Sequence, residues 1–516
     1  MRQPVPRAPS PTSRSVLYRG RTERAGLLLA RDLAGRAFSR AAGAPLVEGN
    51  RVRLLIDARE NYPAWLEAIA AAKRHVHFES YILYDDAVGR RFADVLIARA
   101  QDGVRVRVIY DWLGGLGKTS RAFWNRLRHG GVEVRCFNPP RLDSPVGWLS
   151  RDHRKSLTVD GEVGYVTGLC VGQAWEGVPE KNLEPWRDTG VEIRGKAVAD
   201  IERAFAQVWA MIGEPIPEDE LTDPGTLEPA GDVSVRIVAS VPATAGLLRV
   251  DQLVAALARD RLWLSDAYYA GTTSYVQAVR AAAQDGVDVR LLVPNATDIP
   301  LLRPLTRAGY RSLLEAGVRV FEWNGTMLHA KTAVADGQWA RVGSTNLNVA
   351  SWLGNCELDV IVEDAGFAQA MEQAYLRDLE NSTEVVLNER RRLRAPGAPR
   401  RRRALTMASG GGNGGRAAAG AIRIGHAIGA VFTDRRVLEP VEARIALVSG
   451  LSLLALAILF AWFPRALVYP LAVVLVWIGL VLLYKGYRLH RDGRRGGATP
   501  PHDASARDAP PRRDGT

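Results

Sequence analysis

The hydrophobic positions in the middle of the chain alternate between two patterns. Residues 62–73 and 89–101 place apolar side chains at helical spacing, whereas residues 76–83 and 104–110 are short apolar runs rich in β-branched residues. Helical and extended segments that alternate in this way are typical of α/β units built around a central sheet. We therefore predict an α/β fold for this part of the chain.

This α/β region is duplicated. Residues 100–110 and 283–293 both read Ala-Gln-Asp-Gly-Val followed by an alternating strand pattern, and a second pair of matching segments follows in the same order. An internal repeat of this length predicts two similar structural units. We predict a first half at residues 46–225 and a second half at residues 230–388.

Two uninterrupted apolar runs lie near the C-terminus. Residues 445–463 and 466–484 each hold 19 residues without a charge, and Pro464 and Arg465 separate them. A helix of this length spans about 28 Å, close to the thickness of a hydrocarbon core. Basic residues flank the pair on both sides, which by the positive-inside rule places both ends in the cytoplasm. We predict a transmembrane helical hairpin at residues 441–488, with a buried core hairpin as the alternative.

The remaining segments are basic or of biased composition. We predict a basic segment at residues 1–45, an Arg- and Gly-rich linker at 389–440 and a disordered tail at 489–516. Residues 390–403 hold eight Arg, which favours contact with anionic lipid headgroups. The first residues lack the apolar core of a secretory signal.

The overall charge indicates a polyanionic partner. The formal net charge is +12 and the isoelectric point is near 9.8, so nucleic acid and an anionic membrane surface both qualify. Cys136, Cys170 and Cys356 are scattered along the chain. They indicate neither a disulfide framework nor a structural zinc site, and they fit a reducing compartment.

One sequence motif occurs once in each half. Its spacing is H-x-K-x-x-x-x-D, and its residues are His153, Lys155 and Asp160 in the first half and His329, Lys331 and Asp336 in the second. The chain has 8 His, and only 7 Lys against 61 Arg, so chance is a poor explanation. The residues after each lysine favour a β-strand, on which residues two apart point to the same face. Each motif would therefore place an imidazole beside an ammonium.

This pair of groups suits chemistry on a phosphodiester. The lysine neutralises the non-bridging oxygens, while one histidine attacks phosphorus and the other protonates the leaving alkoxide. Two motifs folded face to face would supply both imidazoles. Ser344 and Asn346 follow the second motif and can donate hydrogen bonds to phosphate oxygens. His75, His77 and His129 are interpreted instead as hydrogen-bonded core residues.

At this point the sequence resembles a known family. The paired motifs resemble those of the phospholipase D superfamily over about residues 46–385. Residues 79–82 (Glu-Ser-Tyr-Ile), residues 89–94, the triplet Trp186-Arg-Asp188 and the C-terminal hairpin resemble bacterial cardiolipin synthases of that superfamily. The resemblance implies two tandem phospholipase D-like α/β sandwich halves that form one active site, a phosphohistidine intermediate, and no metal or other cofactor.

The resemblance also implies roles for single residues. All six motif residues are candidates for the catalytic set, with His153 as the nucleophile and His329 as the general acid. The symmetry of the sequence alone leaves these two roles open. An acidic residue outside the motif is expected to orient each histidine. Glu357 is the candidate for His329, and Asp188 is the candidate for His153.

Two further expectations concern residues near the motifs. Asp160 and Asp336 are expected to hold the local fold rather than to take part in the reaction. Asn346 stands ten residues after Asp336, whereas the equivalent position of the first half is Cys170, where the family usually has a second Asn. Because a thiol is a poor hydrogen-bond donor, the phosphate clamp of the first half is expected to be weaker or rebuilt.

The leading functional hypothesis is a phosphatidyltransferase of the bacterial inner membrane with its catalytic part in the cytoplasm. It would make cardiolipin and glycerol from two molecules of phosphatidylglycerol, with this and other anionic phospholipids as partners and no nucleic acid expected. Hydrolysis to phosphatidic acid is the main alternative and depends on how dry the pocket is. A nuclease would be consistent with the positive net charge but would not account for the predicted transmembrane hairpin. A non-catalytic scaffold would not require both motifs to be intact.

Overall fold

The computed structural model describes residues 35–140, 150–299, 302–387 and 393–394, together with scattered positions within 451–487. The predicted segment 1–45, the linker 389–440 and the tail 489–516 fall wholly or mostly outside these residues. The predicted hairpin also falls largely outside them. Among the helices that the structure describes, none has the length and apolarity needed to cross a bilayer.

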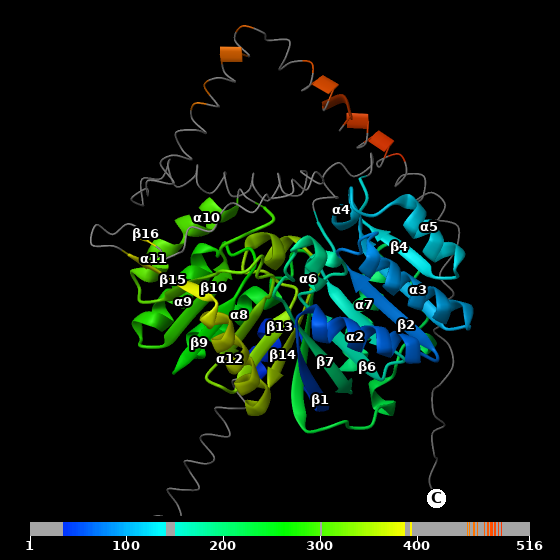
Figure 1. Cartoon of the computed structure of the whole chain (residues 1–516), viewed down its shortest axis with the longest axis horizontal. Coiled ribbons are helices and arrows are strands. Elements are labelled where there is room, and N and C mark those ends of the chain that lie inside the picture. The colour runs from blue at the N-terminus through cyan, green and yellow to red at the C-terminus, as the bar shows by residue number, and fades with distance from the viewer. Residues whose placement is uncertain are drawn as a thin grey trace, which may run out of the picture. The chain divides into compact units, whose positions relative to one another are not determined.

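The two halves share one mixed α/β architecture, as Figure 1 shows. The strands of the first half are β1 (Val47–Ile56), β2 (His75–Ser80), β3 (Arg105–Asp111), β4 (Glu133–Phe137), β5 (Lys155–Val159), β6 (Val163–Thr167) and β7 (Thr189–Gly195). Its α-helices are α2 (Asp57–Ala71), α3 (Ala87–Gln101), α4 (Trp112–Gly115), α5 (Arg121–His129), α6 (Gln173–Glu176) and α7 (Val198–Met211).

The second half repeats this order. Its strands are β8 (Val233–Ser240), β9 (Arg261–Ser265), β10 (Asp288–Pro294), β11 (Arg319–Trp323), β12 (Thr332–Ala335), β13 (Trp339–Gly343), β14 (Glu357–Glu363), β15 (Ser382–Leu387) and β16 (Leu393–Arg394). Its α-helices are α8 (Gly246–Leu257), α9 (Thr273–Gln284), α10 (Leu302–Ala308), α11 (Tyr310–Leu314) and α12 (Ala365–Glu380). The predicted α/β fold and the predicted strands after both motif lysines are confirmed.

The sheets of the two halves are joined edge to edge. From the centre outward, the first half runs β1-β7-β6-β5-β2-β3-β4 and the second half runs β8-β14-β13-β12-β9-β10-β11, followed at its outer edge by β15 and β16. β1 and β8 pair antiparallel and make the sheet continuous across the described residues. The identical order of the seven inner strands is the structural form of the sequence repeat.

The segment Ala-Gln-Asp-Gly-Val occurs in both halves at the point where a helix ends and a strand follows. It ends α3 in the first half and α9 in the second, and each time a glycine follows in the left-handed region, with φ of +87° at Gly103 and +96° at Gly286. A residue with a Cβ rarely adopts this conformation. The glycine ends the helix and turns the chain into the parallel strand β3 or β10.

Four apolar cores stabilise the described body of the molecule, the smallest of them formed around Ile109, Phe205 and Trp209. One core lies under the helices of the first half and one under those of the second. A third is shared between the halves and contains side chains from β6, β7 and α7 together with side chains from β13, β14 and α12. Burial of apolar surface in this shared core holds the two halves together and fixes how their loops meet.

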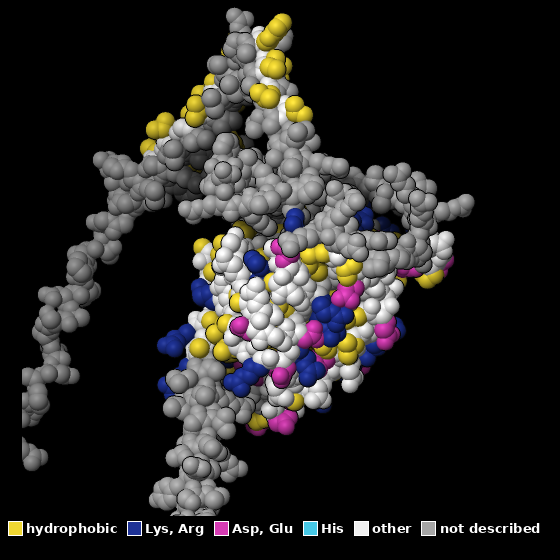
Figure 2. Space-filling view, turned by 90° about the vertical axis from the view of Figure 1, so that its left-hand side faces the viewer, with side chains coloured by type: hydrophobic (Ala, Val, Ile, Leu, Met, Phe, Trp, Pro, Cys, Tyr) yellow, Lys and Arg dark blue, Asp and Glu magenta, His cyan; other side chains and the backbone are white. Residues whose placement is uncertain are grey.

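One face of this body carries intermixed charges. Figure 2 shows basic, acidic and apolar side chains interspersed over the face in view. In the separate unit formed by 140–148 and 444–516, the described positions between 451 and 487 are helical, and many carry exposed large apolar side chains, Trp462 and Leu483 among them.

Candidate active site

The two motifs occupy equivalent places in the sheet. Lys155 begins β5, which lies between β2 and β6, and Lys331 directly precedes β12, which lies between β9 and β13. Each motif histidine lies two residues before its lysine and is buried. The positive charges of Lys155 and Lys331 each act on the histidine of the other motif. The structure therefore brings the two predicted motifs into one site.

Each histidine is held by an acid from the other half. His153 Nδ1 lies 2.9 Å from Glu357 Oε2, and His329 Nδ1 lies 2.7 Å from Asp188 Oδ2. The expectation that Glu357 orients His329 and that Asp188 orients His153 is therefore wrong, although both acids are part of the site. With Nδ1 occupied, Nε2 is the nitrogen left for chemistry on each ring.

Backbone pairing between the halves explains this exchange. The backbone N–H of His153 donates to the carbonyl oxygen of Cys356 at 2.9 Å, and that of His329 donates to the carbonyl oxygen of Arg187 at 2.7 Å. Cys356 and Arg187 directly precede Glu357 and Asp188 in the sequence. Each motif thus runs beside the start of the partner half's strand, β14 or β7, and meets the acid of that strand.

The electrostatics favour neutral imidazoles beside ionised acids. Burial lowers the pKa of His153, and it lowers the pKa of His329 to about 3 with the nearby Lys331 as the next cause. Burial opposes ionisation of Glu357 and Asp188, but the paired histidine and the motif lysines hold the pKa of each carboxyl below its usual value. A neutral imidazole whose Nδ1 proton is bound by a carboxylate is the form needed for attack by Nε2.

The motif lysines are buried beside aromatic rings. Each ammonium donates to the carbonyl oxygen of its own motif histidine. Lys155 Nζ lies 5.3 Å from the centre of the Tyr81 ring, and Lys331 Nζ lies 5.8 Å from that of Tyr268. Burial lowers the pKa of Lys331 to about 8. Two concentrated positive charges in a shielded site are suited to an anionic group such as a phosphodiester.

The motif aspartates serve the backbone. Asp160 accepts hydrogen bonds from the backbone N–H groups of Lys73, Arg74 and His75 at 2.7–2.8 Å. Asp336 accepts three equivalent bonds at 2.9 Å from the backbone of residues 259–261. Both lie beyond the far ends of β5 and β12, away from the histidines. This is the local structural role that was expected of them.

Ser344 and Asn346 differ in what they contact. Ser344 Oγ donates to Glu357 Oε2 at 2.5 Å and accepts from the backbone N–H of Leu358. Its proton is therefore used to position Glu357, and the expectation that it donates to a phosphate oxygen is not supported. Asn346 is buried, and in the part of the chain that the structure describes its Oδ1 has no hydrogen-bond partner. Its amide stays a candidate phosphate donor.

Cys170 lies in the site that it was predicted to modify. Burial raises the pKa of its thiol, opposed mainly by the positive charge of Lys155 and to a smaller extent by Lys331. Its Sγ is thus within electrostatic reach of both motif lysines, but as a neutral thiol. The first-half counterpart of Asn346 therefore supplies neither an amide nor a charge.

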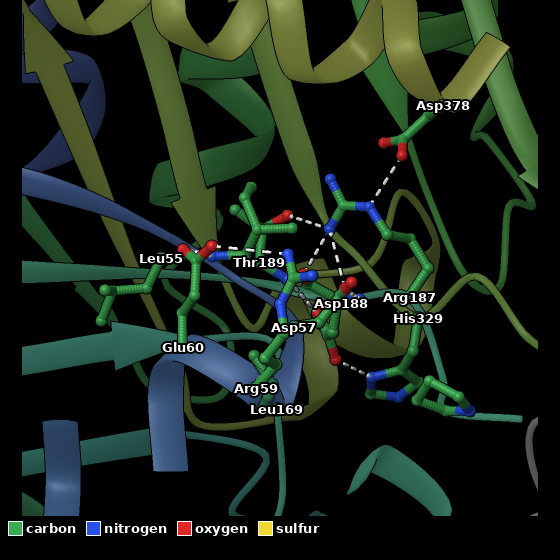
Figure 3. A network of polar contacts seen from close by, with 12 residues as sticks. Leu55, Asp57, Arg59, Glu60, Leu169, Arg187, Asp188, Thr189, His329 and Asp378 are labelled. Atoms are coloured by element: carbon green, nitrogen blue, oxygen red, sulfur yellow. Dashed lines mark hydrogen bonds and ion pairs between the residues drawn. The ribbon is translucent and has the colours of Figure 1, made fainter. Parts of the chain in front are cut away.

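A buried ionic network behind His329 was missed by sequence reasoning (Figure 3). Arg187 Nε lies 2.8 Å from Asp378 Oδ1 on α12, and its NH1 lies 3.4 Å from Asp57 Oδ1 on α2. Asp57 Oδ1 also accepts from the backbone N–H of Asp188 at 2.9 Å. The network fixes the backbone on both sides of the acid that holds His329. Its members are far apart in the chain, so no local pattern connects them.

Aromatic side chains surround the histidines unequally. The Tyr81 ring lies 5.0 Å from His153, centre to centre. His329 is surrounded by Trp175 at 5.5 Å, Trp186 at 5.6 Å and Tyr268 at 5.9 Å. Trp175 Nε1 also donates to Asp188 Oδ2 at 3.1 Å. These rings limit the access of water. Tyr81 and Trp186 lie in segments quoted for the family resemblance, whereas Trp175 and Tyr268 were not predicted.

The other histidines of the body lie outside this site. His75 and His77 are buried near the opposite end of β2, as expected of core residues, but the expected hydrogen bonds are not formed at His75 Nε2 or at either ring nitrogen of His77 among the described residues. His129 is exposed at the C-terminal end of α5, so its interpretation as a core residue is wrong. A basic residue in the last turn of a helix is favourable because the helix dipole is negative at that end.

Comparison with known proteins agrees with this geometry. The family model described as "Cardiolipin synthase, PLD-like domain" matches residues 65–209 and 254–379. A cardiolipin synthase of Alkalihalophilus pseudofirmus is 32% identical over 345 residues, covering 66% of this chain and 68% of that protein. Cardiolipin synthase A of Pseudomonas aeruginosa is 34% identical over 381 residues, covering 71% and 75%.

A solved structure shares the fold. The crystal structure of phosphatidylserine synthase from Haemophilus influenzae aligns with a TM-score of 0.55 at 14% sequence identity, covering 68% of this chain and 91% of that one. At this identity the similarity concerns the arrangement of the two halves.

Proposed function

Because the chain belongs to the cardiolipin synthase family of the phospholipase D superfamily, we propose that it transfers the phosphatidyl group of one phosphatidylglycerol to the hydroxyl of a second. The products are cardiolipin and glycerol. The observation that supports this reaction best is the pair of neutral imidazoles in one site, each oriented through Nδ1 by an ionised acid of the other half.

In the proposed mechanism His153 is the nucleophile and His329 the acid. His153 Nε2 attacks phosphorus, the bond from phosphorus to the glycerol oxygen breaks, and the departing glycerol takes its proton from His329. The hydroxyl of a second phosphatidylglycerol then gives its proton to His329 and attacks the phosphohistidine. This step forms cardiolipin and regenerates neutral His153.

The lysines connect substrate binding to the protonation of His329. In the free site, burial and then the charge of Lys331 are the two largest causes that lower the pKa of His329. A phosphodiester anion bound between Lys155 and Lys331 would offset these charges and raise that pKa. Binding of the substrate therefore favours the protonated His329 that the first step needs.

We place this reaction at the cytoplasmic side of a bacterial inner membrane. The support is the pair of 19-residue uncharged runs with basic flanks and the exposed apolar side chains at the described positions there. In this proposal residues 46–225 and 230–388 form the enzyme, 389–440 link it to the hairpin at 441–488, and 1–45 and 489–516 are accessory. Fractionation of a chain that ends at residue 440 tests the assignment, and retention in the membrane pellet would contradict it.

The reaction is tested with purified full chain in detergent and phosphatidylglycerol as the sole lipid, beside His153→Ala. Cardiolipin with an equal amount of free glycerol, absent from the variant, is the expected result. Phosphatidic acid without cardiolipin would instead identify a hydrolase. Phosphatidylglycerol left unchanged by the wild-type chain would contradict the choice of donor.

A further inference from the structure

Three buried side chains near one end of β2 form a cluster that takes no part in the proposed reaction. His75 and His77 are two residues apart on β2 and so point to the same face of the sheet. They face Glu202 on α7, which is completely buried. Glu202 Oε1 lies 2.5 Å from His75 Nε2 and 3.4 Å from His77 Nδ1. One nitrogen or oxygen from each residue lies within 4.8 Å of the others.

Hydrogen bonds do not account for this convergence. Among the residues that the structure describes, His75 Nε2, both ring nitrogens of His77 and Glu202 Oε1 are buried without an aligned hydrogen-bond partner. The contact between His75 and Glu202 is short but is not a well-aligned hydrogen bond. Ring nitrogens and a carboxylate oxygen that converge in this way need a proton or a metal cation between them, and unsatisfied buried polar atoms are costly.

The charge of Glu202 also needs a partner. Glu202 is completely buried, with Thr222 N donating to its Oε2 and the two imidazoles close to its Oε1. Arg107, which lies opposite His77 on β3, already contacts Glu220 at 2.7 Å and Glu133 at 3.4 Å. An ionised carboxylate in the interior without a compensating cation would destabilise the fold.

The second half shows how the equivalent position is neutralised. Asp160 accepts a bond from the backbone of His75, and Asp336 accepts one from the backbone of Arg261, so these two residues correspond. The corresponding acid on α12 is Glu372, and Arg261 NH1 lies 3.3 Å from its Oε2. The second half therefore places a permanent cation beside its helix carboxylate, where the first half places an imidazole.

The neighbouring positions confirm this correspondence. His77 stacks on Phe205 of α7 with ring centres 4.8 Å apart. In the second half, Trp263 stacks on Tyr375 of α12 at 5.4 Å. The first half has thus kept the aromatic contact while it exchanged Arg and Trp for two imidazoles, a change that adds two metal-binding nitrogens next to a carboxylate.

We propose that His75, His77 and Glu202 bind a divalent transition-metal ion, with Zn²⁺ the best fit. Two imidazoles and one carboxylate are a common zinc ligand set, with metal–ligand distances of about 2.0–2.2 Å. A tetrahedral ion with these distances separates its ligand atoms by about 3.3 Å, close to the 3.4 Å between His77 and Glu202. His75 would move away from Glu202 by less than about 1 Å and toward His77, since the ligand atoms now lie within 4.8 Å of one another. A water would complete the coordination.

The ion would stabilise the fold rather than act on the substrate. His77 is opposite Thr158 in the β2–β5 pair, whereas Ser80 is opposite Lys155. Three residues of strand separate the cluster from the motif lysine by about 10 Å. The ion would connect β2 to α7. Because Thr222 N donates to Glu202 Oε2 at 2.6 Å, it would also connect both to the segment that leads into the second half.

The test is the metal content of the full chain, expressed without a polyhistidine tag and dialysed after purification. We expect about one zinc ion per chain, lost in His77→Gln and in Glu202→Gln. The exposed His129→Ala is the control and should keep the ion. A chelator should lower the Tm of the wild type by several degrees and leave the Tm of the two variants unchanged.

His75→Arg separates the metal from the folding role of the cluster. It copies the arrangement of the second half, so it should lose the ion, remain folded and have a Tm that no longer responds to chelator or to added Zn²⁺. Metal well below stoichiometric in the wild type, with no change of Tm on adding Zn²⁺, would overturn the proposal. Stoichiometric metal that survives in His77→Gln and His75→Arg would place the ion elsewhere and also overturn it.

Discussion

Replacement of Glu357 by Gln tests the exchange of acids between the halves. The substitution keeps the size of the side chain but removes the charge that contacts His153 at 2.9 Å and accepts from Ser344 Oγ at 2.5 Å. Because Glu357 is completely buried, water cannot replace these contacts. We expect a folded protein in which His153 is poorly oriented.

The size of the effect follows from the lost interaction. A hydrogen bond to a charged group contributes roughly 1.5–3 kcal/mol, and about 1.36 kcal/mol corresponds to a tenfold change in rate. We therefore expect kcat for cardiolipin formation to fall roughly 10- to 150-fold, measured with phosphatidylglycerol in mixed micelles. Glu384→Gln, on the partly exposed β15, is the matched control and should keep the wild-type rate.

The pairing itself is measured by NMR titration of labelled histidines. Glu357 raises the pKa of His153, so Glu357→Gln should lower that pKa further and leave the titration of His329 unchanged. A shift at His329 in place of His153, or a kcat equal to that of Glu384→Gln, would refute the exchanged arrangement.

Four further predictions concern single residues. Asp160→Asn should lower the free energy of unfolding by about 1–3 kcal/mol, because a buried acceptor of backbone N–H groups is weakened, while the rate per folded molecule stays near wild type. Denaturant titration and kcat measure the two effects, and a loss of rate without a loss of stability contradicts the prediction. Arg187→Gln should destabilise by about 3–5 kcal/mol, since it leaves Asp378 buried without its cation, and an unchanged Tm would refute this. Burial lowers the pKa of Lys331 to about 8, so the positive charge of its ammonium is lost as pH rises above that value, and kcat/KM should fall there. In Lys331→Arg this fall in kcat/KM should occur only at higher pH. Cys170→Asn should restore an amide donor in the first half and lower KM for phosphatidylglycerol, whereas Cys170→Ser in the same assay should have a smaller effect.

The sequence predicted much of the fold because its repeat is local. The segment that ends at Gly103 or Gly286 encodes a helix end and the following strand within a few residues, and each motif is contained in eight residues. Such patterns can be read without knowing the rest of the structure. The α/β alternation, the two halves and the convergence of the motifs follow from them.

What the sequence did not predict depends on contacts between distant segments. Glu357 was assigned to His329, which lies in the same half, but β14 begins beside the first motif. Arg187 and Asp378 meet across the shared core, and Glu202 reaches His77 from another element. Ser344 was expected to face the phosphate, and only its distance to Glu357 shows where its proton goes. None of these pairs has a spacing that a pattern search would detect.

The exchange of acids also has a consequence for how this duplicated sequence can change over generations. In each repeat, the motif histidine is oriented by an acid of the other repeat. The acid of each repeat in turn orients the histidine of the other. An inherited loss of Asp188 would therefore be felt at His329, in the other copy. Neither repeat can lose its site residues while the other alone sustains the reaction. Selection therefore acts on the two repeats as a single unit. This mutual dependence accounts for two complete motifs in one chain, where duplicated segments are otherwise free to diverge.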